Sequence, residues 1–131
     1  MSGIQGGVVA VGTDICDVER VQNMILRYGS AFLEKTFTES EIAYCSKFKN
    51  SAERFAARFA AKEAMAKALQ CGFAEGVSPK SLSVQNSENG APYAVLDECA
   101  KNKMLAMGGK KMHISLSHLK DYAVAYAVIS G

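Results

Sequence analysis

The sequence predicts an α+β domain in which an antiparallel sheet packs on one long central helix. Three observations support this prediction. Residues 50–72 form a helical pattern with many alanines and no proline or glycine before the glycine at its end. Residues 112–118 and 122–129 alternate as strands do. Helical and strand patterns occupy separate parts of the chain instead of alternating strictly, which is typical of the α+β class.

The chain has 131 residues, the length of one ordinary domain, and we expect a single domain over residues 1–131. Residues 1–7 lack the basic and apolar regions of a signal peptide, and we interpret them as a flexible leader. Apolar residues make up 49% and charged residues 21% of the chain, a composition typical of globular proteins.

Charge and cysteine usage argue against several classes of protein. A net charge of +2 is too small to indicate nucleic acid as a partner, and the locally clustered basic residues suit a compact anion better. No apolar run approaches the ~20 residues of a membrane span, so we expect no membrane partner. The cysteines stand far apart without metal-ligand spacing, which argues against zinc and for free thiols in a reducing cytoplasm: Cys16, Cys45, Cys71 and Cys99.

The first expected elements are a strand and a helix. Residues 8–11 are a β-branched run, and the following Gly12-Thr-Asp14-Ile delivers Asp14 into a turn. A second interpretation makes Asp14 the N-cap of the helix expected over residues 15–28. In that helix Arg20 and Arg27 lie one heptad apart and share a face.

Helical signals continue through the middle of the chain. A short helix is expected over residues 31–36, and Thr38 with Glu41 forms a capping box for the next one. Asn50 is then the expected N-cap of the long helix, with Glu53 in capping-box position.

The long helix carries an alanine face, a polar pair at its edge and a separate basic row. At about 100° per residue, small side chains that let another backbone approach closely gather on one side: Ala56, Ala57, Ala60, Ala61, Ala64 and Ala68. Glu63 and Lys67 stand one turn apart at the edge of this face. A helix that merely packs on a sheet has no need of this pair, so its placement suggests chemistry. A separate basic row consists of Arg54, Arg58 and Lys62.

The last third of the chain indicates a hairpin, a short helix and two strands. Asn89-Gly90 marks a tight turn between strands at 82–84 and 92–96, and Asp97 caps the helix that follows. Alternation places three polar side chains on one face of the strand at 112–118: His113, Ser115 and Ser117. It also gives the last strand a small-residue face that fits the alanines of the long helix: Ala123, Ala125 and Ala127.

These polar residues suit phosphate chemistry. Carboxylates such as Asp14 and Glu63 are preferred ligands of Mg²⁺, which fills its remaining positions with water and substrate phosphates. Lysine, arginine, histidine and serine are common phosphate partners. None of these signals is specific alone, since a Glu–Lys pair at i,i+4 is usually a solvated pair worth ~0.3–0.5 kcal/mol. A strand histidine such as His113 is more often structural, and we interpret His118 in that way.

Four segments resemble the holo-acyl-carrier-protein synthase family, the small 4′-phosphopantetheinyl transferases. They occur in the family's order and span nearly the whole chain: Gly12-Thr-Asp14-Ile, Arg58-Phe-Ala-Ala-Lys-Glu63-Ala-Met-Ala-Lys67-Ala, Asn89-Gly-Ala-Pro92 and His113-Ile-Ser-Leu-Ser-His118. The early G-x-D together with the K-E-A-x-x-K-A helix is the specific pair.

The resemblance implies a role for each matching residue. Asp14, Glu63 and Lys67 are the expected catalytic residues; the two carboxylates bind Mg²⁺ and the lysine assists the departing phosphate. Five residues are expected to contact coenzyme A, the donor substrate: Arg58, Lys62, His113, Ser115 and Ser117. The first helix is expected to dock the acidic acyl carrier protein through Arg20, Met24 and Arg27. The resemblance also implies a homotrimer with active sites between subunits.

The reaction implied by the resemblance moves the 4′-phosphopantetheine group of coenzyme A onto a serine of the apo carrier protein and releases adenosine 3′,5′-bisphosphate. Either a metal-held water or a metal-ligating carboxylate is the base for the serine hydroxyl. The sequence departs from the family at two places. Ala91 stands where the family often has lysine, and the first helix carries only two arginines.

A rival hypothesis from another class is a non-catalytic regulatory domain that binds coenzyme A or a nucleotide. In such a domain the basic row and the strand hydroxyls merely hold the ligand. The carboxylate pair discriminates between the two hypotheses, because binding an anion gives no reason to place Asp14 near Glu63. Whether ligand binding requires Mg²⁺ is the simple observation that separates them.

Overall fold

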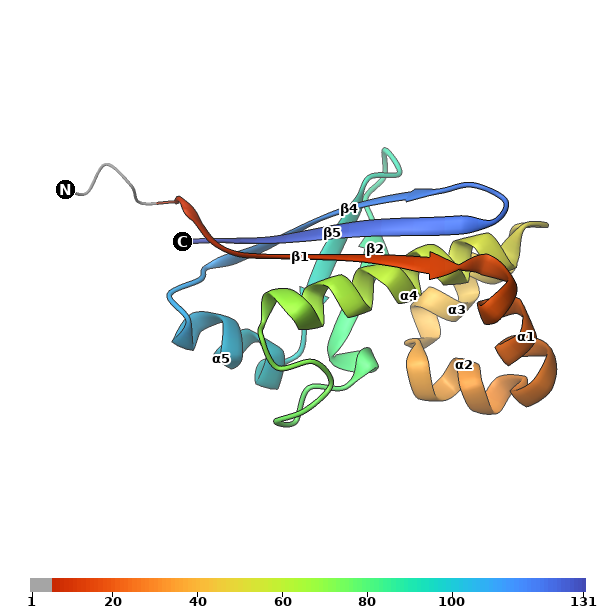
Figure 1. The fold of residues 1–131 in the computed structure, drawn as a ribbon, viewed down its shortest axis with the longest axis horizontal. Helices are drawn as coiled ribbons and strands as arrows, with labels where there is room; N and C mark the ends of the chain where they lie inside the picture. The colour runs from red at the N-terminus through yellow and green to blue at the C-terminus, as the bar shows by residue number, and fades with distance from the viewer. Residues whose placement is uncertain (1–5) are drawn as a thin grey trace.

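The computed structural model describes residues 6–131, so most of the expected leader lies outside the described residues. One long helix, α4 (Ser51–Ala68), runs along a three-stranded antiparallel sheet (Figure 1). The strand order is β1-β5-β4, with β1 at Val8–Asp17, β5 at Tyr122–Ser130 and β4 at Lys111–His118. This arrangement confirms the predicted α+β class with its central helix.

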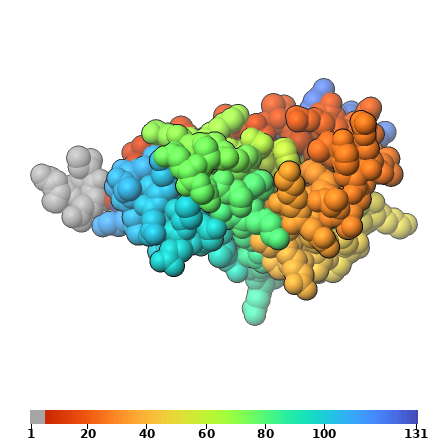
Figure 2. Space-filling view, turned by 90° about the horizontal axis from the view of Figure 1, so that it is seen from below, coloured from red at the N-terminus to blue at the C-terminus, as the bar shows by residue number. Residues whose placement is uncertain are grey.

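The remaining elements surround α4. Three short helices gather near the start of α4: α1 (Val18–Tyr28), α2 (Ser30–Thr36) and α3 (Glu39–Ser46). A 3-10 turn, a separate antiparallel hairpin and a helix follow α4: η2 (Pro79–Ser81), β2 (Leu82–Asn86), β3 (Pro92–Leu96) and α5 (Glu98–Ala106). Figure 2 shows α1 to α3, in orange, and α5, in cyan, at opposite ends of the molecule. Within residues 6–131, no helix has the length and apolar character needed to cross a membrane.

The first strand is longer than the sequence suggested. β1 continues to Asp17, whose side chain accepts a hydrogen bond of 2.9 Å from the backbone N–H of Glu19 and caps α1. Asp14 instead pairs opposite Ala125 inside the sheet. Interpreting Asp14 as the N-cap of the first helix is therefore wrong, because its backbone belongs to the sheet ladder.

The predicted capping box is present at α3 but not at α4, where Asn50 is nonetheless the N-cap residue, as predicted. At α3 the backbone N–H of Thr38 donates to Oε1 of Glu41 over 2.9 Å, and the reciprocal bond completes the capping box. At α4 the side chain of Asn50 makes no capping hydrogen bond. The carboxylate of Glu53, expected to reach back to Asn50, is 3.0 Å from Nδ1 of His118 instead.

The alanine face of α4 packs on the sheet as expected. All six alanines of this face are at most 3% exposed, and so are Ala123, Ala125 and Ala127 of β5. β1 approaches even more closely, because a Cβ on Gly12 would lie 2.0 Å from the carbonyl oxygen of Ala64. Only glycine allows this backbone-to-backbone contact, which sets the position of the strand on the helix.

Candidate active site

Asp14 and Glu63 lie at the contact between β1 and α4. Asp14 is two residues beyond Gly12 and therefore shares its face of the sheet, the face that covers α4. Glu63 is adjacent to Ala64 in the chain. The pKa of Glu63 is raised above its ordinary value, first by burial and then by the charge of Asp14. The two carboxylates therefore lie close enough to interact electrostatically.

Lys67 completes this cluster. Its ammonium group lies 3.1 Å from Oδ1 of Asp14 and donates a second hydrogen bond of 3.0 Å to the carbonyl oxygen of Thr13. The charges of Lys67 and Arg20 both lower the pKa of Glu63, which partly offsets the effect of Asp14. The structure thus brings together the three residues expected to be catalytic and places the basic face of α1 within electrostatic reach of them.

A basic recess lies on the other flank of α4. Arg54 and Arg58 point away from Glu63, since about 100° per residue places them well around the helix from it. The recess has a volume of about 140 Å³ between α4, the β2–β3 hairpin and the end of β4. Its lining includes Arg54, Arg58, Asn86, Gly90, Pro92 and His118.

Aromatic rings of α3 and of the turn that follows it hold the two guanidinium groups of this recess. The guanidinium of Arg54 lies 4.0 Å from the ring centre of Phe48, and that of Arg58 lies 4.3 Å from the ring centre of Tyr44. Arg58 is 4% exposed and donates to the side-chain oxygen of Asn86. Within residues 6–131 neither arginine forms an ion pair with a carboxylate, and both Nε atoms are buried without a hydrogen-bond partner. Two fixed, uncompensated cations favour an anionic ligand.

Lys62 belongs to the protein interior. It is fully buried, and its ammonium group donates to Oε1 of Glu41 and to the carbonyl oxygens of Pro79 and Leu82 over 2.8, 2.9 and 3.0 Å. Burial lowers its pKa. An ammonium group has three N–H donors, and all three are used. The predicted contact of Lys62 with coenzyme A is therefore incompatible with this geometry.

His113, Ser115 and Ser117 lie on the outer face of the sheet, which points away from α4. All three are exposed, as their alternation predicted, and Nε2 of His113 is 2.8 Å from Oγ of Ser130. Within one chain they do not approach Asp14 or Glu63. The same outer face carries four large apolar side chains that are more than half exposed: Val11, Ile15, Tyr122 and Tyr126.

The three residues expected to dock a carrier protein are adjacent on α1. Arg20, Met24 and Arg27 line one shallow recess of about 380 Å³. Both arginines are exposed, and Met24 is half-buried between them. The expected shared face of the first helix is therefore present.

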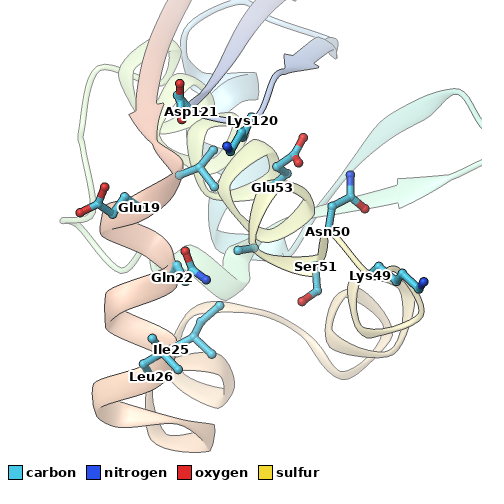
Figure 3. A pocket seen from close by; sticks show the side chains of 12 residues that line it. Glu19, Gln22, Ile25, Leu26, Lys49, Asn50, Ser51, Glu53, Lys120 and Asp121 are labelled. Atoms are coloured by element: carbon cyan, nitrogen blue, oxygen red, sulfur yellow. The ribbon is translucent and has the colours of Figure 1, made fainter.

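Sequence reasoning did not place His118 in the basic recess, which it lines in the structure. The alternation that placed His113 outside also places residues 112, 114, 116 and 118 on the inner face, toward α4, so the signal was available. Its partner Glu53 lines a different groove of about 460 Å³ between α1 and the start of α4 (Figure 3). That groove contains none of the predicted site residues.

Comparisons with known proteins identify the family of this chain. A family model described as the 4′-phosphopantetheinyl transferase superfamily matches residues 10–127. The chain is 39% identical over 122 residues to the holo-acyl-carrier-protein synthase of Koribacter versatilis, which covers 93% of this chain and 98% of that protein. Identity to the same enzyme of Protochlamydia amoebophila is 40% over 122 residues, with the same shares covered.

Two solved structures show the same fold. Holo-acyl-carrier-protein synthase of Neisseria meningitidis matches with a TM-score of 0.86 and 26% identity over 95% of this chain and 99% of that one. The Helicobacter pylori enzyme, solved in complex with coenzyme A, matches with a TM-score of 0.80 and 32% identity over 92% and 99%. The family match includes the strand and helix that bring Asp14 to Glu63, and the chain therefore belongs to the 4′-phosphopantetheinyl transferase superfamily, as a transferase of the holo-acyl-carrier-protein synthase family.

Proposed function

We propose that this protein transfers the 4′-phosphopantetheine group of coenzyme A to a serine hydroxyl of an apo acyl carrier protein and releases adenosine 3′,5′-bisphosphate. The observation that carries the proposal is the cluster of Asp14, Glu63 and Lys67 where β1 meets α4. Relatives similar over nearly the whole chain are named for this reaction, and one similar structure holds coenzyme A.

The carboxylate pair fits a magnesium ion. Burial and the neighbouring charge of Asp14 disfavour the ionised form of Glu63, which is the situation a divalent cation relieves. Mg²⁺ takes one or two protein carboxylates and leaves its other positions to water and substrate phosphates. Asp14 and Glu63 would hold the ion, which when bound supplies positive charge to the pyrophosphate of coenzyme A.

Lys67 is placed to hold the departing phosphate. Two of its three N–H donors bond to Asp14 and Thr13, and its side chain is 55% exposed, which leaves one donor for a ligand. The β-phosphoryl group of coenzyme A goes to the carrier serine while the adenosine phosphate leaves. The ammonium group of Lys67 would donate to that phosphate as negative charge builds on it.

The basic recess would take the phosphate that does not react. Coenzyme A carries a pyrophosphate, which must lie at the acid pair, and a separate 3′-phosphate. Arg54 and Arg58 offer two pre-oriented guanidinium groups, with His118 beside them. We assign the 3′-phosphate to this recess, so Arg58 keeps the expected role in coenzyme A binding and Lys62 does not.

Within one chain the acid pair and the basic recess lie on different sides of α4. The acid pair lies at the β1 flank of α4 and the recess at the β4 flank, with the helix and its alanine face between them. A coenzyme A molecule that reaches both therefore needs the recess of one subunit beside the acid pair of another. The exposed apolar residues of the outer sheet face would be covered in such an assembly. We infer a homotrimer with shared sites, in which His113, Ser115 and Ser117 meet a neighbouring subunit.

The carrier protein would dock on α1. The recess of Arg20, Met24 and Arg27 offers two exposed cations around an apolar side chain, which suits an acidic protein surface. Because the charge of Arg20 reaches Glu63, a carrier bound there brings its serine close to the acid pair. The described cysteines are free thiols, which fits a cytoplasmic enzyme that serves fatty acid biosynthesis.

The proposal is tested by incubating the protein with apo acyl carrier protein and coenzyme A, with Mg²⁺ or with a chelator, and measuring the intact mass of the carrier. We expect a gain of one phosphopantetheine group only with Mg²⁺, together with release of adenosine 3′,5′-bisphosphate. An unchanged carrier mass, or equal transfer in the presence of the chelator, would overturn the proposal or its metal requirement respectively.

A further inference from the structure

Glu53 and His118 form a pair that connects two distant parts of the chain. Glu53 lies in the first turns of α4 (Figure 3), and His118 ends β4. Oε1 of Glu53 is 3.0 Å from Nδ1 of His118, across 65 positions of sequence. The two side chains are 21% and 23% exposed, so the pair is largely shielded from water.

This contact determines which ring nitrogen of His118 carries a proton. An ionised carboxylate can only accept a hydrogen bond, so Nδ1 must be the donor. Nε2 then makes no hydrogen bond with any residue in the range 6–131. His118 lines the basic recess and Glu53 does not, so the carboxylate acts on the recess only through the ring.

The two arginines beside the His118 ring indicate that the ring is oriented toward an anionic ligand. Arg54 and Arg58 are held by aromatic rings in the same recess, with no carboxylate of the described chain paired to them. A carboxylate that reached into the recess would cancel this positive charge. Glu53 instead binds the ring nitrogen of His118 from outside the recess, which fixes the ring without adding a competing acceptor there.

We infer that Glu53 is a positioning residue for coenzyme A binding: by accepting a hydrogen bond from Nδ1–H it fixes the orientation of the His118 ring, so that the imidazolium form donates its Nε2–H to the phosphate held by Arg54 and Arg58. The inference rests on the proposed function, in which that phosphate is the 3′-phosphate of coenzyme A. A pair with no such role would affect only the stability of the fold and would not change KM for one donor selectively.

The test compares Glu53→Ala and Glu53→Gln with the unmodified protein, using coenzyme A and 3′-dephospho-coenzyme A as donors. Glu53→Ala should raise KM for coenzyme A by about fivefold to tenfold, the effect of one hydrogen bond, with little change in kcat. KM for 3′-dephospho-coenzyme A should stay the same. Glu53→Gln retains an acceptor oxygen and should restore most of the affinity. Glu98→Ala removes an exposed glutamate from α5 and is the matched control, expected to change neither donor's KM.

Two results would overturn the inference. An equal rise in KM for both donors, or a change in kcat alone, makes Glu53 a structural residue. Unchanged kinetics in Glu53→Ala makes the pair irrelevant to the recess. Histidine ¹⁵N chemical shifts give a readout independent of folding stability: His118 should be protonated at Nδ1 in the unmodified protein and should lose this preference in Glu53→Ala. A ring without a proton on Nδ1 in the unmodified protein would also overturn the inference.

Failure of the proposed function gives a different result. In that case the unmodified protein transfers no phosphopantetheine, and the positioning role of Glu53 is tested by nucleotide binding alone. Calorimetry would then compare adenosine 3′,5′-bisphosphate with adenosine 5′-monophosphate. We expect Glu53→Ala to weaken the binding of adenosine 3′,5′-bisphosphate and to leave the binding of adenosine 5′-monophosphate unchanged. Equal affinities of Glu53→Ala and the unmodified protein for the bisphosphate, or no binding by either, would count against the positioning role.

Discussion

Glu63 lowers the stability of the folded protein when its side chain is charged. Its pKa is raised from the ordinary value of 4.5 by burial and by Asp14, so the folded protein holds this proton more tightly than the unfolded chain does. The free energy of unfolding therefore falls as pH rises through the interval between 4.5 and the raised value. Above that interval the charged Glu63 continues to lower stability, which a bound cation would reverse.

The variant Glu63→Gln separates these effects. It keeps the size and hydrogen bonding of the side chain but removes the charge, so we expect loss of transfer together with a higher melting temperature at neutral pH without metal. Mg²⁺ should raise the melting temperature of the unmodified protein and not that of the variant. Glu98→Gln on α5 serves as the control for surface charge. Near-normal turnover of Glu63→Gln at modest Mg²⁺ would remove Glu63 from the metal site.

At the scale of single elements, predictions from sequence succeeded where the deciding contacts are local. The capping box of Thr38 and Glu41 and the Asn89-Gly90 turn involve near neighbours, and both elements formed as predicted. Glu53 failed as a cap because a histidine 65 positions away takes its carboxylate. Lys62 follows Arg58 by one helical turn and so belongs to the same row by spacing. Its contact with Glu41 of α3, which spacing cannot reveal, makes it an interior residue.

The role of α1 is tested by reversing its charge. Replacing Arg20 and Arg27 with glutamate should raise KM for the carrier protein sharply while KM for coenzyme A stays constant, because in our proposal the helix steers the carrier electrostatically. Transfer by the unmodified protein should slow with added salt, since interactions between exposed charges are largely screened beyond ~8–10 Å at physiological ionic strength. The double variant Lys80→Glu with Lys101→Glu changes net charge equally at exposed positions elsewhere and should behave like the unmodified protein. An unchanged carrier KM in the α1 variant would place docking elsewhere.

At the scale of the whole molecule, the two sites that we propose for one coenzyme A lie apart within one chain. The sequence placed Arg58 in a basic row separate from Glu63, but it did not indicate that the two residues would lie on opposite flanks of one helix. That separation arises from the alanine face between them, which is covered by β5. Oligomer formation is therefore expected to complete the site and not merely to stabilise the fold.

Mixing two inactive variants tests this shared site. Glu63→Gln should lack the metal site and Arg58→Ala the phosphate recess, and each should be inactive alone. After the subunits exchange, a site that takes its recess from Glu63→Gln and its acid pair from Arg58→Ala should be active. With equal amounts of the two variants, about one site in four should have this composition. Sedimentation should show a trimer for both variants and for the mixture. No recovery after proven exchange would mean that both halves come from one chain.

The backbone contact at Gly12 has a consequence for how the site responds to its cation. Because the strand rests directly on the carbonyl of Ala64, no flexible side chain lies between the two backbones that carry Asp14 and Glu63. The repulsion between the two carboxylates is then overcome once, when the chain folds. In the proposed metal site an arriving ion would find Asp14 and Glu63 already close together and would need little further ordering of the protein. The small-residue packing of β1 on α4 would thus make the proposed site a property of the folded core, whereas a site on a loop would have to become ordered at each turnover.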